Sequence, residues 1–288
     1  MAKIFCVANQ KGGVGKTTTA VNLSAGLAKV GQRVLMVDLD PQGNATMGSG
    51  VDKRQLKLSV YDVLLESATI AEARVRSERL IEAGCAYDVL GANRDLAGAE
   101  VELVDVERRE RRLKEAIAQV AGEYDFVLID CPPSLSMLTL NGLCAAHGVI
   151  VPMQCEYFAL EGLSDLVNTI KQVHANLNRD LEIIGLLRVM FDPRITLQQQ
   201  VSDQLKAHFG DKVFNTVIPR NVRLAEAPSY GLPGVAFDPS ARGSQAFVEF
   251  ANEMVERIGG PRLAAAARPA AAAPQPVSLG ALLHKKEQ

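Results

Sequence analysis

The stretch that decides the fold is Lys11-Gly12-Gly13-Val14-Gly15-Lys16-Thr17-Thr18. An apolar run at residues 4–8 precedes it, and a helical pattern continues from it to about residue 30. Glycines have no Cβ, so the backbone can fold around phosphate oxygens with successive N–H groups and a helix N-terminus facing the anion. In such a loop Lys16 reaches the β and γ phosphates and the Thr17 hydroxyl binds Mg²⁺. The sequence therefore predicts a nucleotide site between a strand and a helix.

Short apolar runs, most of them continuous rather than alternating, recur along the chain and predict buried strands of a parallel sheet. They lie at residues 4–8, 34–37, 87–90, 126–129, 148–151, 183–189 and 213–218. Helical patterns separate them, including a charged helix at about 106–120. Another has one apolar face made of Leu160, Leu163, Val167, Ile170, Val173, His174 and Leu177. The alternation predicts an α/β fold with a doubly wound, mainly parallel sheet and right-handed crossovers.

Composition excludes several classes of protein. Of 288 residues 48% are hydrophobic, enough for a sizeable core, and 31 basic residues nearly balance 33 acidic ones. Any DNA-binding surface must therefore be a local patch. The five cysteines contain no C-x-x-C pair, and the four histidines share no metal-ligand spacing with them, which argues against a structural metal site. The sequence shows neither a signal peptide nor a membrane span, so we expect a cytoplasmic protein.

The composition changes at the C-terminal end. Residues 1–258 form the predicted ATPase domain, whereas residues 259–288 are rich in alanine and proline and predict a disordered extension. The end of this extension is slightly apolar and then basic. Two interpretations remain open for it, an inert tail and a docking peptide.

Two further segments place carboxylates at the ends of predicted strands, where ligands gather in open α/β sheets. Asp38 and Asp40 follow residues 34–37, and by spacing alone either could approach Mg²⁺ or the attacking water. Asp130 ends the run 126–129, as the acid of a Walker B element does, and is expected to hold a Mg²⁺-bound water.

One departure from the generic phosphate loop is informative. The glycine expected five residues before the Gly15-Lys16 pair is Gln10, and Lys11 follows it. This pattern resembles the deviant Walker A loop of the ParA, MinD and nitrogenase iron-protein class of P-loop NTPases. Segments 131–141, 189–194 and 218–229 resemble the ParA members of that class, and the resemblance covers about residues 1–258.

The resemblance implies roles for individual residues. Two protomers sandwich two nucleotides, and Lys11 contacts the phosphate of the partner's ATP beside Lys16. Asp40 positions the attacking water, while Asp38 belongs to the metal shell with Thr17 and Asp130. The same resemblance implies that Pro219, Arg220 and Asn221 line the adenine and that Arg194 and Arg223 contact DNA.

The implied function is a slow switch ATPase in chromosome or plasmid partitioning. It would form a homodimer with ATP and Mg²⁺ and bind non-specific double-stranded DNA on the nucleoid. It would release the DNA after hydrolysis stimulated by a ParB-like partner. The region 188–223 contains three acids and six basic residues that could contact DNA phosphates. The basic residues are Arg188, Arg194, Lys206, Lys212, Arg220 and Arg223. A MinD-like membrane-cycling ATPase would need an amphipathic C-terminal helix, which proline interrupts here, so no stable membrane association is expected. An iron-protein or amide-ligase relative is disfavoured because no cysteine pair is set to bridge a cluster.

Overall fold

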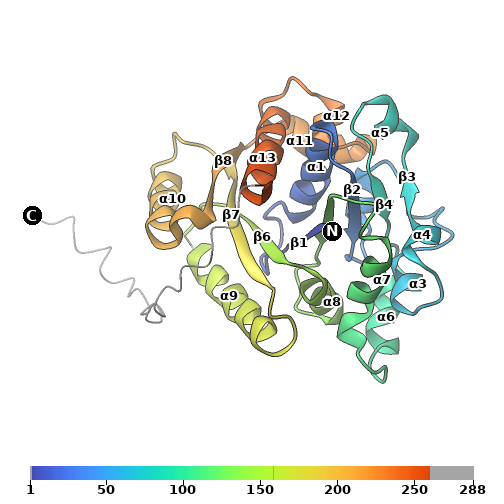
Figure 1. Ribbon diagram of the computed structural model, residues 1–288. Coiled ribbons are helices and arrows are strands. Elements are labelled where there is room, and N and C mark those ends of the chain that lie inside the picture. Colours follow the sequence, from blue (N-terminus) through green and yellow to red (C-terminus); the bar gives the residue numbers. More distant parts are fainter. Residues whose placement is uncertain (1, 158, 260–288) are drawn as a thin grey trace, which may run out of the picture. The chain divides into compact units, whose positions relative to one another are not determined.

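The computed structural model describes residues 2–157 and 159–259 and contains an eight-stranded sheet (Figure 1). The strand order is β3-β4-β2-β5-β1-β6-β7-β8; β3 is antiparallel to β4, and the other neighbours are parallel. The strands are β1 Lys3–Val7, β2 Val34–Asp38, β3 Val75–Arg76, β4 Asp88–Leu90, β5 Phe126–Asp130, β6 Gly148–Met153, β7 Glu182–Phe191 and β8 Val213–Pro219. The predicted doubly wound α/β fold is confirmed.

Helices connect the strands and cover both faces of the sheet. Figure 1 shows α1 and α13 on one side and α8 and α9 on the other. The α-helices are α1 Lys16–Lys29, α2 Asn44–Gly48, α3 Val60–Leu64, α4 Ile70–Ala73, α5 Glu78–Glu82, α6 Leu96–Glu102, α7 Arg112–Val120, α8 Met137–Ala145, α9 Ala159–Asn176, α10 Thr196–Phe209, α11 Val222–Glu226, α12 Gly234–Phe237 and α13 Arg242–Gly259. Three 3₁₀ turns are η1 Arg109–Arg111, η2 Gly210–Lys212 and η3 Ala227–Tyr230.

All seven predicted strands are present, and their burial explains their continuous apolar sequences. Strands β1, β2, β5 and β6 lie inside the sheet and are buried along almost their whole length. The two-residue strand β3 was missed because it is too short to show an alternating pattern. The charged helix predicted at 106–120 was wrong at its start: Arg108 adopts a positive φ of 56°, and α7 begins only at Arg112.

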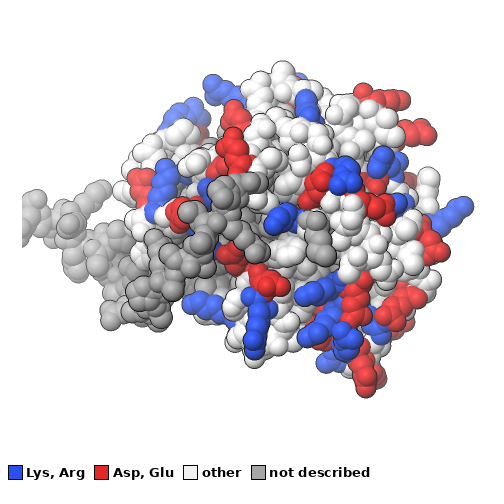
Figure 2. All heavy atoms as spheres, viewed as in Figure 1, with Lys and Arg blue, Asp and Glu red and all other residues white. Residues whose placement is uncertain are grey.

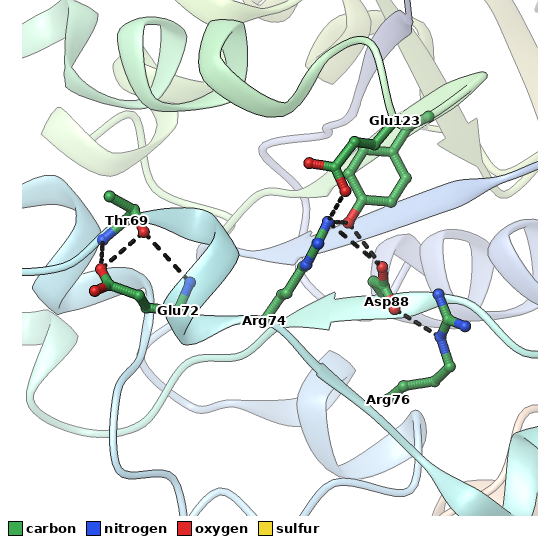
Figure 3. Close-up of polar contacts among 7 residues, drawn as sticks. Thr69, Glu72, Arg74, Arg76, Asp88 and Glu123 are labelled. Carbon is green, nitrogen blue, oxygen red and sulfur yellow. Dashed lines mark hydrogen bonds and ion pairs between the residues drawn. The ribbon is translucent and has the colours of Figure 1, made fainter.

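A polar network fixes β3 at the edge of the sheet, at the amino ends of the neighbouring parallel strands (Figure 3). The Tyr124 hydroxyl donates to one oxygen of Asp88 at 2.7 Å, and Arg76 Nε donates to the other at 2.7 Å. Arg74 Nη1 donates to Glu123 at 2.6 Å and to the Tyr124 hydroxyl oxygen. These contacts tie a strand that has few ladder hydrogen bonds of its own to β4 and to the start of β5.

The described residues up to Val255 form one compact unit. Residues 260–288, for which the sequence predicts a disordered extension, lie outside the described residues. In the part of the chain that is described, no helix has the length and apolar character needed to span a bilayer. All five cysteines are buried with free thiols, as expected for core residues.

Candidate functional site

The phosphate loop lies between β1 and the N-terminus of α1, as predicted. Gly13 and Gly15 adopt positive φ angles of 72° and 78°, a region that favours glycine. A Cβ added at Gly12 or Gly13 would meet no atom within 4 Å, so the loop is not packed against other parts of the chain at these two positions. Backbone N–H groups and the positive end of the α1 dipole are available there for an anion.

Lys16 is placed to serve this loop. Its side chain is largely buried, and its Nζ donates to the carbonyl oxygen of Lys11 at 3.1 Å across the loop. Burial lowers the pKa of the Lys16 ammonium, whereas the nearby carboxylates Asp130 and Asp40 raise it. The cation therefore sits between the loop and the acidic end of the sheet, where a phosphate would meet it.

Asp130 ends β5 beside the last residues of β1 and β2, opposite Val7 and Asp38 in the register. It is fully buried, and its Oδ2 accepts a hydrogen bond from the Thr17 hydroxyl at 2.8 Å. Its Oδ1 is buried without any hydrogen-bond partner in residues 2–157 and 159–259. Burial and the neighbouring Asp38 raise the pKa of this carboxyl well above its usual range. Mg²⁺ prefers oxygen ligands, so an unpaired buried oxygen next to a threonine hydroxyl fits the ion or a water molecule bound to it.

Asp38 and Asp40 differ in how their oxygens are used. Asp38 is fully buried, and its Oδ2 accepts from the backbone N–H and hydroxyl of Thr46 at 2.8 and 2.7 Å. Its Oδ1 accepts from the Asp40 N–H at 3.0 Å, and burial raises its pKa to about 6. Asp40 is partly exposed and accepts from the Gln42 N–H with Oδ1. Asp38 thus anchors α2 through Oδ2, whereas Oδ1 accepts a single hydrogen bond and keeps a lone pair for a metal ion or its water.

Lys11 lies on the exposed side of the loop, and its Nζ pairs with Glu156 at 2.6 Å. Its own N–H donates to the Asn9 side chain at 3.0 Å. Glu156 belongs to the connection between β6 and α9, at the carboxyl edge of the sheet. Sequence reasoning missed Glu156 because an acid in a loop carries no signal of its own.

A cavity of about 410 Å³ opens beside the phosphate loop. Its lining includes Thr17 and Thr18 of α1, three residues of α2, and residues 227–229. The predicted adenine-lining residues lie just before residues 227–229 in sequence: Pro219 ends β8, Arg220 is exposed, and the Asn221 side chain caps α11 by accepting from the Leu224 N–H. None of these three lines the cavity, and their role in base binding stays a prediction.

Comparison with known proteins identifies the family. A family model described as an AAA domain matches residues 2–183. The sporulation initiation inhibitor protein Soj of Bacillus subtilis is 51% identical over 254 residues, covering 88% of this chain and 98% of Soj. The chromosome partitioning protein ParA of Caulobacter vibrioides is 48% identical over 257 residues, covering 88% and 94%. The chain belongs to the ParA/Soj family of partitioning ATPases.

A solved structure similar to this ParA/Soj chain carries a different name. It is cobyrinic acid a,c-diamide synthase from Mycobacterium smegmatis with bound ADP and magnesium, 40% identical with a TM-score of 0.77, covering 90% of this chain and 96% of that one. The likeness supports the fold and a nucleotide-binding site, whereas the more similar Soj and ParA proteins carry partitioning names.

The two arginines expected to contact DNA in this ParA/Soj chain lie in similar surroundings. Arg194 and Arg223 follow the carboxyl ends of β7 and β8 and are exposed, although each is paired, Arg194 with Asp192 at 2.7 Å and Arg223 with Glu226 at 2.9 Å. Arg194 holds the pKa of Asp192 at about 2. On the face shown in Figure 2, basic and acidic side chains are intermingled.

Arg188 cannot belong to a DNA patch, and counting it among the available cations was wrong. It is 3% exposed, and its guanidinium donates to Ser202 Oγ and to the carbonyl oxygens of Phe214 and Asn215 at 2.8 to 3.0 Å. Apolar residues flank Arg188 on both sides in the sequence, and a charged residue within a buried stretch of strand is a signal that could have indicated an internal role.

Proposed function

We propose that the chain is a DNA-partitioning switch that binds ATP with Mg²⁺, pairs with a second copy, and holds non-specific double-stranded DNA on the nucleoid while paired. Release follows hydrolysis, which is slow until a ParB-like partner stimulates it. The observation that carries the nucleotide site is the buried, unpartnered Oδ1 of Asp130 beside the Thr17 hydroxyl at an open phosphate loop. Membership in a family of partitioning ATPases supports the rest.

Each residue of the loop has a role in this proposal. Backbone N–H groups from Gly12 to Thr18 bind the phosphates, Val14 packs the loop onto the core, and Lys16 neutralises charge on the β and γ phosphates. Thr17 and Asp130 hold Mg²⁺ or its water, with Asp38 behind them. Bound Mg²⁺ would neutralise phosphate charge and orient the γ phosphate for in-line attack. Pro219, Arg220 and Asn221 would line the adenine.

Asp40 is the residue we assign to the attacking water. It is partly exposed, and only one of its oxygens accepts a hydrogen bond among the described residues. The other oxygen is free to orient a water molecule and to accept a proton from it. Its position two residues after β2 places it near Lys16, whose pKa it raises.

Lys11 supplies the link between ATP and pairing. Its half-exposed ammonium pairs with Glu156, whereas the Lys16 ammonium reaches across the loop to the Lys11 carbonyl oxygen. A cation in that place can stabilise negative charge on the nucleotide of a second copy, as an arginine finger does. Nucleotide occupancy and dimerisation then become one event, and two copies of Arg194 and Arg223 form a larger basic surface.

DNA retention at several salt concentrations, with ATP, ADP and no nucleotide, tests the proposal. We expect retention of arbitrary DNA with ATP alone, falling steeply with salt because phosphate contacts release counterions. Arg194→Ala should weaken retention and flatten the salt dependence. Arg33→Ala is the matched control, since Arg33 is also exposed and paired to an aspartate but lies at the amino end of β2. DNA retention that does not depend on the nucleotide would refute the proposal. So would retention that Arg194→Ala and Arg33→Ala weaken equally.

A further inference from the structure

Two side chains of the connection between β6 and α9 form hydrogen bonds with the phosphate loop. Gln154 Nε2 donates to the Gly13 carbonyl oxygen at 3.2 Å and contacts Met190 Sδ at 3.0 Å. Two residues later, Glu156 accepts from Lys11 Nζ at 2.6 Å. The connection between β6 and α9 therefore contacts the phosphate loop at both Lys11 and Gly13.

The partner of Gln154 is itself in an uncommon conformation. Met190 adopts a positive φ of 51° at the carboxyl end of β7, where the pairing with β8 is irregular. A non-glycine residue in that region costs free energy and persists where the surroundings hold it. The Met190 side chain reaches the phosphate loop, since its Cε lies 3.7 Å from a Cβ built on Gly15. Gln154 is thus held between two ordered elements, and it fixes where Glu156 can lie.

We propose that Glu156 is a positioning residue that holds Lys11 on its own subunit while the chain is unpaired. The inference rests on the proposed role of Lys11 in pairing. In a dimer the Lys11 ammonium must extend toward the partner's triphosphate, so it gives up the Glu156 carboxylate, and this exchange occurs twice in each dimer. Glu156 therefore raises the concentration of ATP-loaded protein that is needed for pairing.

The expected size of the effect follows from exposure. Both side chains of the Lys11–Glu156 pair are 46% exposed, so water and salt screen the attraction. Exposed ion pairs of this kind change an equilibrium by about 1.4- to 5-fold. Two such pairs are broken when a dimer forms, which gives about 2- to 30-fold on the dimerisation constant.

Glu156→Gln tests the first consequence. With a slowly hydrolysed ATP analogue, analytical ultracentrifugation should show that the variant pairs at a protein concentration about 2- to 30-fold lower than the wild type needs. Glu182→Gln is the matched control, because Glu182 also pairs with an exposed lysine, Lys212, at 3.5 Å, but at the amino end of β7. Unchanged or weaker pairing by Glu156→Gln overturns the inference.

A second measurement needs neither nucleotide nor pairing. In the nucleotide-free chain, the rate at which an acetylating reagent modifies Lys11 should rise about 1.4- to 5-fold in Glu156→Gln and stay unchanged in Glu182→Gln. A general structural role for Glu156 would not accelerate Lys11 selectively, and an unchanged Lys11 rate overturns the inference. If the wild type fails to pair with the analogue, the proposed function fails instead, so the two failures are distinguishable.

Discussion

Replacing Arg188 should separate fold stability from DNA binding. Arg188 belongs to β7, where its backbone is in register with Met153 of β6 and Val217 of β8, and its guanidinium is buried. Burial lowers its pKa, its Nε has no hydrogen-bond partner within the described residues, and no carboxylate forms an ion pair with it there. Its stabilising contribution comes from the donors that it supplies to α10 and β8.

The magnitude for Arg188→Met follows from those donors. Two backbone carbonyl oxygens and the Ser202 hydroxyl lose a charged donor, at about 1–3 kcal/mol for each group left unsatisfied. Removing a buried, unpaired charge returns part of this loss. We expect a net loss of about 3 kcal/mol in unfolding free energy, which in a domain of this size lowers the melting temperature by about 6–12 °C.

The assay is urea unfolding followed by circular dichroism, combined with DNA retention well below the melting temperature. Arg188→Met should lose stability and keep ATP-dependent retention, whereas Arg194→Ala should do the reverse because its side chain is 88% exposed. Arg188→Lys should be intermediate, since one ammonium cannot make the same set of contacts. A folded Arg188→Met variant of wild-type stability, or one that loses DNA selectively, would refute the reasoning.

Three further predictions concern the site and its support. Gly142→Ala in α8 should destabilise the fold by about 1 kcal/mol, because its Cβ would lie 3.2 Å from Cys131 Sγ, Cys6 Sγ and Leu39 Cδ1. Gly162→Ala in α9 has open space at the Cβ and should stabilise the fold by about 0.5–1 kcal/mol. Urea titration measures both changes. Burial raises the pKa of Asp38 from 3.8 to about 6, so the neutral acid is favoured in the fold and this contribution to stability is lost as pH rises through 6. Between pH 5 and pH 7.5 the nucleotide-free wild type should lose about 1 kcal/mol relative to Asp38→Asn, and a pH-independent difference would contradict this assignment. Asp40→Ala should bind ATP and DNA but hydrolyse at least about 100-fold more slowly in a phosphate-release assay, and wild-type turnover would remove Asp40 from its role.

The parts of the fold that the sequence predicted are those whose pattern is local. Continuous apolar runs indicated the buried strands, and the glycines at 12, 13 and 15 indicated the loop, because positive φ angles and close phosphate approach need glycine. The sequence placed each of the acids after β2 and β5 at the carboxyl end of a strand, where ligands gather, and only the family resemblance put them in one metal site. The register pairs Asp38 with Asp130 directly.

What the sequence could not predict depends on contacts between distant segments. Glu156 meets Lys11 only because β6 lies beside β1, and Thr46 occupies Asp38 only because α2 folds back over the end of β2. Arg188 was counted as available for DNA because arginine side chains are mostly exposed. In the fold, three buried hydrogen-bond acceptors offset the cost of burying its guanidinium. These cases share one cause, which is that burial and partners are properties of the assembled sheet.

We propose that Lys11 of one copy stabilises the nucleotide bound to the other copy. The most direct test is the molar mass of the chain with a slowly hydrolysed ATP analogue, measured by light scattering for the wild type and for Lys11→Ala, together with nucleotide affinity. We expect a dimeric wild type and a monomeric Lys11→Ala that still binds the analogue within about threefold of wild-type affinity, because Lys16 contacts the loop in its own subunit. A wild type that remains monomeric, or a Lys11→Ala variant that pairs equally well, would contradict the proposal.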